Sequence, residues 1–425
     1  MVMMEKQTRT DRISNLPWDV LDAILVHLPL KDAARTSILS SKWRYKWISL
    51  SQFVFDDKCF SNTLLNKVDR WGEIMKIIHR VQKNHSGPIE KFKLAAYCCP
   101  NHLDLDQWMH FLAEKGIKEF VLKEFYFIRR FKLPCCLFSC QQLRHLELYG
   151  CTFKLPPEFK GFKCLASLQL RQVCVDSDTL ESLILQCPVL ERLILLKIDG
   201  LTCLKIHNPN LKYLKIYTEF GNIYLENNPL LSSIDIHPTS VNLEMNMFCS
   251  LEEWKACNLF RVLGCLSGVK RFSLSGHFLE FLGTSNVPER LPERFNRLMA
   301  LELREVSFKS LNEVMVFLAI LQSSPNLEEL SISHRDLEVG SYDIPIVEFL
   351  KSRYLLGSLN HLQVVRIRGI MVSRPEWELI KLILASSPAL KTMTIVKYRG
   401  SRIPESVFLQ VERASENAKI ISLTL

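Results

Sequence analysis

A six-residue pattern recurs along most of this chain and constrains its fold more than any other feature. The pattern places apolar residues at its first, fourth and sixth positions, and successive copies start about twenty to thirty-five residues apart. Ten clear copies start at Leu143, Leu165, Leu190, Leu211, Leu231, Val269, Leu298, Leu327, Leu362 and Leu390, and weaker ones at Ile89, Ile117 and Leu251. The alternation within each copy predicts a short strand with one buried face. Such a strand cannot cover that face alone, so neighbouring copies must stack into a solenoid.

The connections between copies predict helices in part of the chain. Three of them contain two polar residues at the spacing of a helix capping box: Asp178 and Glu181, Ser310 and Glu313, and Ser373 and Glu376. A proline precedes the leading leucine by two residues in five copies, at Pro188, Pro209, Pro229, Pro325 and Pro388. Because proline cannot continue a helix, it marks the return into the strand. Between Leu190 and Leu251 the copies are about twenty residues apart, which leaves room for loops rather than full helices.

The length and composition of the chain are typical of a folded protein with several domains or a solenoid. A chain of 425 residues is too long for one ordinary core and indicates two or three domains or a solenoid. Its 48% hydrophobic and 23% charged residues exclude wholesale disorder. The formal charge of +9 permits an acidic partner but does not demand nucleic acid.

Residues 11–50 differ from the repeats and predict a small unit of two or three helices. Pro17 suits the first turn of a helix, which Pro29 would end. Leu21, Ile24, Leu25 and Leu28 form one apolar stripe on that helix. A second helix is expected from Lys31 and a third through residues 43–47. About forty residues is near the lower limit for an independent core, so the stripe could either bind a partner or pack on the chain's own domain.

The amino-acid sequence of this segment resembles the F-box of plant F-box proteins. Residues 11–17, 28–40 and 43–47 read D-R-I-S-x-L-P, L-P-x-K-D-A-x-R-T-S-I-L-S and W-R-x-x-W, at the spacing of that motif. The resemblance implies binding to a Skp-family adaptor and, through it, to a cullin and RING protein. It assigns the adaptor contacts to Leu16, Pro17, Ile24, Leu25, Leu28, Leu30, Ile38 and Trp43. Trp18 and the Ser41-Lys42 pair depart from the usual motif. These departures lower the expected affinity for the adaptor more than they weaken the identification of the segment as an F-box.

Two further resemblances cover most of the remaining chain. The repeats are similar to irregular leucine-rich repeats (LRR) of plant type. The last seventy residues resemble the FBD domain of plant F-box proteins, in the strand patterns after Leu362 and Leu390 and the helix between them. Further elements are expected as a strand at 53–55, helices at 61–84 and 406–418, and a strand at 420–425. The predicted fold is α/β, with an F-box at 1–50, irregular repeats at 51–350 and an FBD unit at 351–425 that completes the solenoid.

The resemblance implies a substrate-recognition subunit of an SCF (Skp–cullin–F-box) ubiquitin ligase, with no catalytic residues of its own. The expected contacts to an unknown protein substrate lie between the last two apolar residues of each copy: Glu147, Gln169, Lys215, Asp235, Glu302 and Arg366. These side chains could equally form an ordinary solvated strand face. A repeat scaffold that binds a partner without delivering it for degradation remains the alternative. No cofactor is expected, although a small-molecule co-ligand remains open.

Other chemistry is weakly indicated or not at all. Ser267 lies fourth rather than third between Gly264 and Gly268, which does not match a nucleophile elbow. No pair of C-x-x-C motifs has zinc spacing, so no metal is expected, and Cys151, Cys174 and Cys187 are expected as core thiols. Without a secretory signal, the fourteen cysteines are expected as free thiols in a reducing compartment. The alternating basic and aromatic residues 42–47 could contact nucleic acid, but they are better explained as part of the F-box.

The expected location is inside the cell, in the nucleus, the cytoplasm or both. Residues 1–10 contain no apolar run typical of a secretory signal. The longest apolar stretches, such as 314–321, fall far short of a membrane span, so no membrane association is expected.

Overall fold

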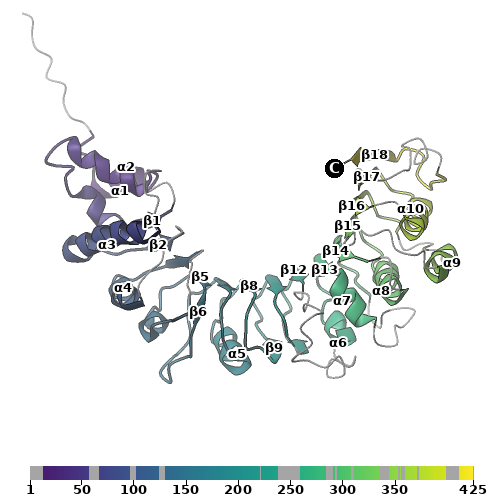
Figure 1. Ribbon diagram of the computed structural model, residues 1–425, viewed down its shortest axis with the longest axis horizontal. Coiled ribbons are helices and arrows are strands. Elements are labelled where there is room, and N and C mark those ends of the chain that lie inside the picture. The colour runs from purple at the N-terminus through teal and green to yellow at the C-terminus, as the bar shows by residue number, and fades with distance from the viewer. Residues whose placement is uncertain are drawn as a thin grey trace, which may run out of the picture. The chain divides into compact units, whose positions relative to one another are not determined.

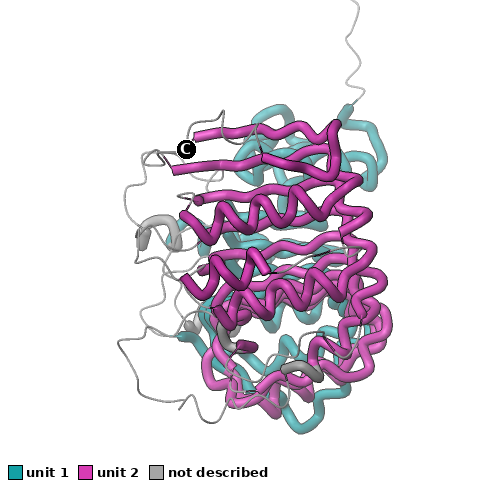
Figure 2. Tube along the Cα trace, turned by 90° about the vertical axis from the view of Figure 1, so that its right-hand side faces the viewer, with its two compact units in different colours: residues 1–174 teal, residues 175–425 magenta. Residues whose placement is uncertain are grey.

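The chain forms two compact units, residues 1–174 and 175–425, which are described separately (Figure 2). The computed structural model describes residues 13–56, 67–95, 102–123, 130–220, 222–237, 259–283, 291, 294–307, 311–334, 344–352, 355, 359–370, 373–398 and 411–424. No helix within these ranges is long and apolar enough to cross a membrane. The boundary between the units lies inside the predicted repeat region, and the predicted domain limits at residues 50 and 350 stay predictions.

The first unit begins with a small helical module. Its elements are α1 (Trp18–Leu25), α2 (Leu30–Arg35) and two 3-10 turns, η1 (Thr36–Ile38) and η2 (Lys46–Ser49). Pro17 precedes the first helical residue, as predicted, but α1 ends at Leu25 rather than at Pro29. The predicted third helix is wrong: residues 41–45 form turns that lead into η2. Side chains of Trp43 and Trp47 are nevertheless buried, because tertiary packing and not helical periodicity places them.

The remainder of the first unit is a parallel sheet with helices on one side. The strands follow one another in the order β1 (Gln52–Phe55), β2 (Lys91–Leu94), β3 (Glu119–Leu122), β5 (His145–Tyr149) and β7 (Ser167–Arg171). The connections contain α3 (Lys67–Asn84), α4 (His102–Glu114), η4 (Cys135–Ser139) and a small pair of strands, β4 (Phe131–Lys132) and β6 (Cys151–Thr152). The strand predicted at 53–55 is present, and α3 lies within the predicted helix 61–84.

In the described residues of the second unit, the same arrangement continues over nine parallel strands. These are β8 (Arg192–Leu196), β10 (Tyr213–Tyr217), β12 (Ser233–Ile236), β13 (Arg271–Ser275), β14 (Ala300–Val306), β15 (Glu329–His334), β16 (Val364–Ile370), β17 (Thr392–Lys397) and β18 (Lys419–Thr424). The helices are α5 (Ser177–Leu185), α6 (Leu259–Gly264), α7 (Gly276–Leu282), α8 (Leu311–Gln322), α9 (Ile344–Ser352) and α10 (Arg374–Ser386). Where the copies are closest, β9 (Cys203–Ile206) and β11 (Asn222–Leu225) form a second parallel pair instead of helices.

Every clear copy of the six-residue pattern contains one of these strands. The weaker copies at Ile89 and Ile117 are β2 and β3, whereas the copy at Leu251 lies outside the described residues. Neighbouring strands pair in the same register relative to the six-residue pattern, so their apolar positions are aligned. Leu214 pairs with Ile234, for example, and Leu301 with Leu330. These side chains are at most 1% exposed. In the second unit the helices lie on one side of the strands (Figure 1), so the polar positions between the leucines form an open strand face.

The first residues of the helices test the three predicted capping boxes. The capping box of α10 is confirmed, since the Ser373 N–H donates to the Glu376 carboxylate over 2.5 Å. Helix α5 instead begins after Asp176, whose carboxylate accepts the Thr179 N–H, so the predicted box from Asp178 is wrong. Ser310 lies outside the described residues.

Two elements at the end of the chain were predicted and one of them is found. Strand β18 confirms the strand expected at 420–425. The helix expected at 406–418 is wrong over 411–418, which form bends and turns; 406–410 lie outside the described residues.

Prolines 188, 209 and 229 mark turns that two asparagines hold together. The Asn208 amide donates to the carbonyls of Ile184 and Cys187, over 3.2 and 2.8 Å. The Asn228 side chain accepts the Asn208 N–H over 2.9 Å, so one repeat binds the next. Asn208 is 1% exposed. Its hydrogen bonds satisfy backbone carbonyls that would otherwise be unpaired in a buried turn. The proline spacing alone did not indicate these hydrogen bonds.

Candidate adaptor-binding and substrate-binding surfaces

Two polar contacts, one buried and one half-buried, hold the helical module together. The Trp43 Nε1–H donates to Ser14 Oγ over 2.6 Å and thereby joins the two ends of the motif. The Asp22 carboxylate of α1 accepts the Ser51 N–H over 3.0 Å and the Ser51 hydroxyl over 2.6 Å. The module is therefore attached to the segment that leads into β1, and its geometry does not depend on apolar packing alone.

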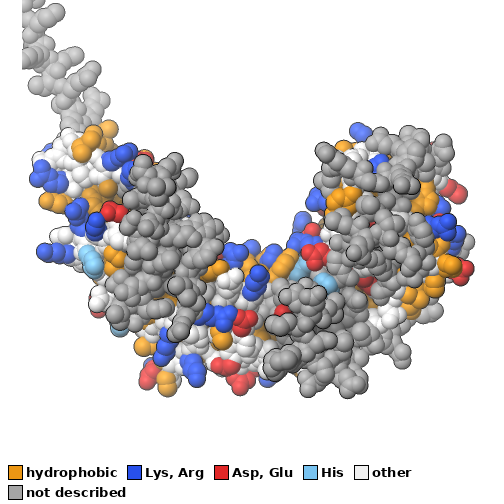
Figure 3. Space-filling view, viewed as in Figure 1, with side chains coloured by type: hydrophobic (Ala, Val, Ile, Leu, Met, Phe, Trp, Pro, Cys, Tyr) orange, Lys and Arg blue, Asp and Glu red, His pale blue; other side chains and the backbone are white. Residues whose placement is uncertain are grey.

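The module leaves large apolar side chains uncovered. Of the exposed large apolar residues in the described part of the chain, eight lie in this module: Ile13, Trp18, Val20, Ile24, Leu28, Ile38, Leu39 and Tyr45. Ile38 is 87% exposed and Leu39 66%. Figure 3 shows apolar side chains gathered over α1 and α2. Exposed apolar residues concentrated in this way are typical of a protein-binding surface rather than of a solvated helix pair.

The eight predicted adaptor contacts divide between surface and core. Pro17, Ile24, Leu28 and Ile38 are exposed, and Leu16 is half-buried. Leu25, Leu30 and Trp43 are at most 5% exposed and form the core of the module together with Leu21. The assignment of all eight stays a prediction, but a buried side chain can support adaptor binding only by holding its neighbours in place.

Sequence reasoning missed several members of the exposed set. Val20 precedes Ile24 by four residues, so both lie on the outer face of α1, beside the buried stripe of Leu21 and Leu25. Their spacing was visible in the sequence. Leu39 and Tyr45 lie in turns, where no periodicity could have indicated their exposure.

The predicted substrate contacts of the first unit bind each other. Gln169 Nε2 donates to Glu147 Oε1 over 2.9 Å, and Lys123 Nζ lies 3.1 Å from Glu147 Oε2. Glu147 is 3% exposed. These contacts satisfy a carboxylate that would be costly to bury alone, which indicates a structural role as strongly as a binding role.

In the second unit, three strands contribute a connected polar cluster to the open strand face. Lys215 Nζ lies 3.1 Å from Asp235 Oδ2 and 4.5 Å from the centre of the Tyr217 ring. The Tyr217 ring stacks on His237 with centroids 4.5 Å apart. From β14, Arg304 donates to the Tyr217 hydroxyl.

Charge and burial set the ionisation of this cluster. Burial alone would raise the pKa of Asp235, but the adjacent His237 and Lys215 outweigh it and hold that pKa below its ordinary value. Burial raises the pKa of the Tyr217 hydroxyl to about 12, so it stays protonated at neutral pH. At neutral pH Asp235 is therefore ionised and the Tyr217 hydroxyl is neutral.

Asp235, His237 and Ser273 resemble a catalytic triad only in composition. His237 Nε2 lies 2.7 Å from Asp235 Oδ1 and 3.2 Å from Ser273 Oγ, so one ring nitrogen faces both partners. A proton relay needs one nitrogen for the carboxylate and the other for the hydroxyl. This geometry does not provide a relay.

The remaining two predicted contacts also form ion pairs. Glu302 lies 2.9 Å from Arg304, and Arg366 lies 3.2 Å from Glu329. All six predicted substrate contacts thus have partners within the chain. The open strand face also carries basic residues that the sequence analysis did not select, including Arg271 and Arg368.

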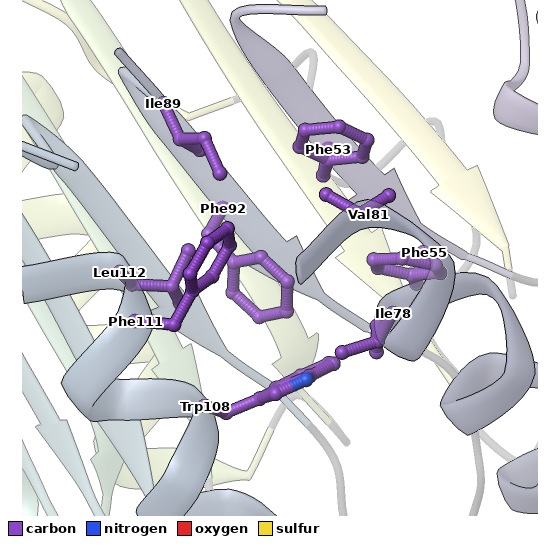
Figure 4. Close-up of a pocket in the computed structure, with 9 residues that line it drawn as sticks. All are labelled: Phe53, Phe55, Ile78, Val81, Ile89, Phe92, Trp108, Phe111 and Leu112. Atoms are coloured by element: carbon purple, nitrogen blue, oxygen red, sulfur yellow. The ribbon is translucent and has the colours of Figure 1, made fainter. Parts of the chain in front are cut away.

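A cavity of about 20 Å³ lies in the first unit between α3, α4 and the first strands (Figure 4). Its walls are apolar side chains: Phe53, Phe55, Ile78, Val81, Ile89, Phe92, Trp108, Phe111 and Leu112. It can hold about one water molecule, which is too little for a ligand. It is a small gap between apolar side chains.

The described part of the chain has neither a metal-binding cluster nor a reactive thiol at Cys140 or Cys151. No three His, Cys, Asp or Glu side chains there are grouped to hold a metal ion. Burial raises the pKa of the Cys140 and Cys151 thiols to about 12, so these two cysteines are unreactive core residues. Ser267 lies in a turn between α6 and β13, the reverse of the strand-to-helix order of a nucleophile elbow.

Comparison with known proteins gives matches along most of the chain. Residues 13–54 match the F-box domain, residues 105–332 the family described as "FBD-associated F-box protein At5g56370, LRR repeats", and residues 358–395 the FBD. The Arabidopsis thaliana F-box/FBD/LRR-repeat protein At1g13570 is 38% identical over 386 residues, 91% of each chain. FBD-associated F-box protein At5g22730 of the same plant is 28% identical over 91% of this chain and 87% of its own. The F-box, repeat and FBD resemblances are thereby confirmed, and the chain belongs to the plant F-box/FBD/LRR-repeat family.

Proposed function

We propose that this protein is the substrate-recognition subunit of an SCF-type ubiquitin ligase. Its F-box module would bind a Skp-family adaptor and, through it, the cullin and RING subunits. Its repeats would hold a substrate protein near the ubiquitin-transfer machinery, which acts by proximity and needs no catalytic residue in this chain. We place this activity in the nucleus, the cytoplasm or both.

The single observation that supports adaptor binding most is the exposed apolar surface of the module. An apolar side chain contributes about 1.5–3 kcal/mol when it becomes fully buried. A micromolar complex needs about 8 kcal/mol, after the costs of association are met. Eight large exposed side chains within residues 13–45 are therefore sufficient for a stable complex.

Replacing Ile24 and Leu28 with aspartate tests this role. Both side chains are exposed, at 46% and 40%, so the folded module should tolerate the change. The buried neighbour Leu25 is unsuitable, because its loss would unfold the module. We expect Ile24→Asp/Leu28→Asp to weaken adaptor binding more than about tenfold, since two charges would have to be desolvated in the interface. Binding to a purified Skp-family adaptor is measured by calorimetry.

A matched control replaces Leu230, which is 50% exposed and lies in the second unit, by aspartate. Leu230→Asp should bind the adaptor as the wild type does. Failure of the wild-type protein to bind any Skp-family adaptor would contradict the ligase function and favour the scaffold alternative. Equal losses in both variants would show a general effect on folding.

A further inference from the structure

We propose that the open strand face of the second unit binds an acidic, carboxylate-rich segment of a protein partner. This inference rests on the proposed function, in which the same face recruits the substrate. It adds the chemical class of the segment that is recognised and the side chains that recognise it.

Basic side chains exceed acidic ones on this face. Among the described strand residues that point away from the core, seven are basic: Arg192, Lys215, Arg271, Arg304, Arg366, Arg368 and Lys419. Four are acidic: Asp235, Glu302, Glu305 and Glu329. The face is therefore electropositive, which favours the approach of an anionic segment.

Ion pairs within the chain neutralise some of these basic side chains, so the excess positive charge lies at a few positions. Lys215, Arg304 and Arg366 pair with Asp235, Glu302 and Glu329, as described above. Such pairs are already satisfied and gain little from a partner. Arg192, Arg271, Arg368 and Lys419 are exposed and have no ion pair with any described residue. Arg192 lies over the Tyr213 ring at 4.0 Å, so its guanidinium is already oriented.

Serine side chains lie among the strand positions between Arg271 and Arg368. Strand β15 places Ser331 and Ser333 between β14 and β16, and β13 contributes Ser273. Small hydroxyl side chains let an extended segment lie close to the sheet while the longer arginines reach its carboxylates. Strands lie about 4.8 Å apart and residues about 3.3 Å apart, so Arg271 and Arg368 are roughly 20 Å from each other. An extended segment of about six residues spans this distance.

The arrangement fits a polypeptide better than a nucleic acid. A nucleic acid presents closely and regularly spaced phosphates, whereas Arg271 and Arg368 lie far apart, with the Glu302–Arg304 and Glu329–Arg366 ion pairs between them. A polypeptide can space its carboxylates to meet the arginines and place neutral residues over the acidic side chains. Arginine also binds carboxylates in bidentate geometry, which gives such contacts specificity.

Fluorescence anisotropy of a labelled peptide tests the proposal with the full chain. The probe is a peptide of about ten residues that alternates Glu and Ser, and its uncharged counterpart alternates Gln and Ser. We expect the Glu peptide to bind at low ionic strength and the Gln peptide not to bind. Arg271→Ala and Arg368→Ala should each weaken binding about threefold, and the double variant about tenfold, the range typical of exposed charges at an interface.

Arg297→Ala is the matched control, because Arg297 is exposed and lies in the turn before β14, outside the open strand face. It removes the same charge and should leave peptide binding unchanged. Equal affinity of the wild type and the double variant, equal loss in the Arg297→Ala control, or no binding by the wild type would each overturn the proposal. Adaptor binding by the double variant separates the two proposals: it should equal the wild type, and Ile24→Asp/Leu28→Asp should lose the adaptor but keep the peptide.

Discussion

At the scale of single residues, backbone strain marks a place where the chain departs from the repeat. Glu305 has a φ of 54° and Gly369 a φ of 71°. Both lie where the register shifts, on β14 and β16 respectively. Two neighbouring parts of the solenoid therefore use the same left-handed kink, but only one of them has glycine, for which this conformation is unstrained.

Replacing Glu305 with glycine should stabilise the protein. The side chain is exposed, and the left-handed conformation costs a non-glycine residue about 1–2 kcal/mol, part of which glycine's greater freedom in the unfolded chain offsets. We expect a gain in the free energy of unfolding of up to about 1 kcal/mol, measured by urea denaturation. Ser331→Gly, in the middle of β15, is the control and should lose about 0.5–1 kcal/mol. A loss of stability in Glu305→Gly would show that the Glu305 side chain stabilises the bulge.

At the scale of elements, a buried histidine connects the helical module to the first strands. His85 follows α3, is 7% exposed, and its Nε2 lies 3.1 Å from the Leu50 carbonyl at the end of η2. Burial, the largest cause, lowers the pKa of His85 below 6.5, and burial likewise lowers the pKa of His145 on β5. Both residues favour the neutral form in the folded state.

This direction predicts that the first unit loses stability on acidification. The unfolded chain binds a proton at His85 more readily than the folded chain, so stability is full above about pH 6.5 and falls as the pH drops below that value. His85→Gln should show a shallower dependence of the urea midpoint on pH between about 8 and 5. The exposed His207 gives the control His207→Gln. Identical slopes for His85→Gln and the wild type would refute this role of His85.

At the scale of the whole molecule, the two candidate surfaces belong to different compact units. The apolar surface lies on the helical module of the first unit, whereas the basic open strand face belongs to the second. Strand β18 closes the end of the sheet in the second unit by pairing with β17. Met393 and Ile395 of β17 are fully buried, and β18 is half-buried or exposed along its length. The final strand thus protects the edge of the solenoid.

A chain that ends at residue 398 should be less stable and should self-associate. It would expose the edge of β17 and part of its apolar side chains, which we expect to lower the free energy of unfolding by at least about 2 kcal/mol. Urea denaturation and light scattering after size-exclusion chromatography measure the two effects. Leu423→Ser, which changes an exposed residue of β18, should affect neither. A stable, monomeric truncated chain would show that β18 is dispensable.

Predictions from the sequence succeeded where the signal was local and periodic. The clear copies of the repeat are strands because alternation is a property of neighbouring residues, and the capping box before α10 needs only Ser373 and Glu376. The third helix of the module and the helix expected at 406–418 were wrong over the described residues, because no period distinguishes turns from helices there. The start of α5 was wrong because Asp176 caps the helix instead of Asp178. Strands β9 and β11 were missed because each pairs only with the other, about twenty residues away.

The amino-acid sequence by itself determined the family, the order of its three parts and the alternation of core and open positions, because each depends on the spacing of residues near one another in the chain. The tertiary structure alone decided which side chains are free to bind. It buried Leu25, Leu30 and Trp43 and exposed Ile24 and Ile38. It also paired Lys215 with Asp235 and Arg366 with Glu329 while leaving Arg271 and Arg368 without ion-pair partners among the described residues, because strand register brings distant residues together.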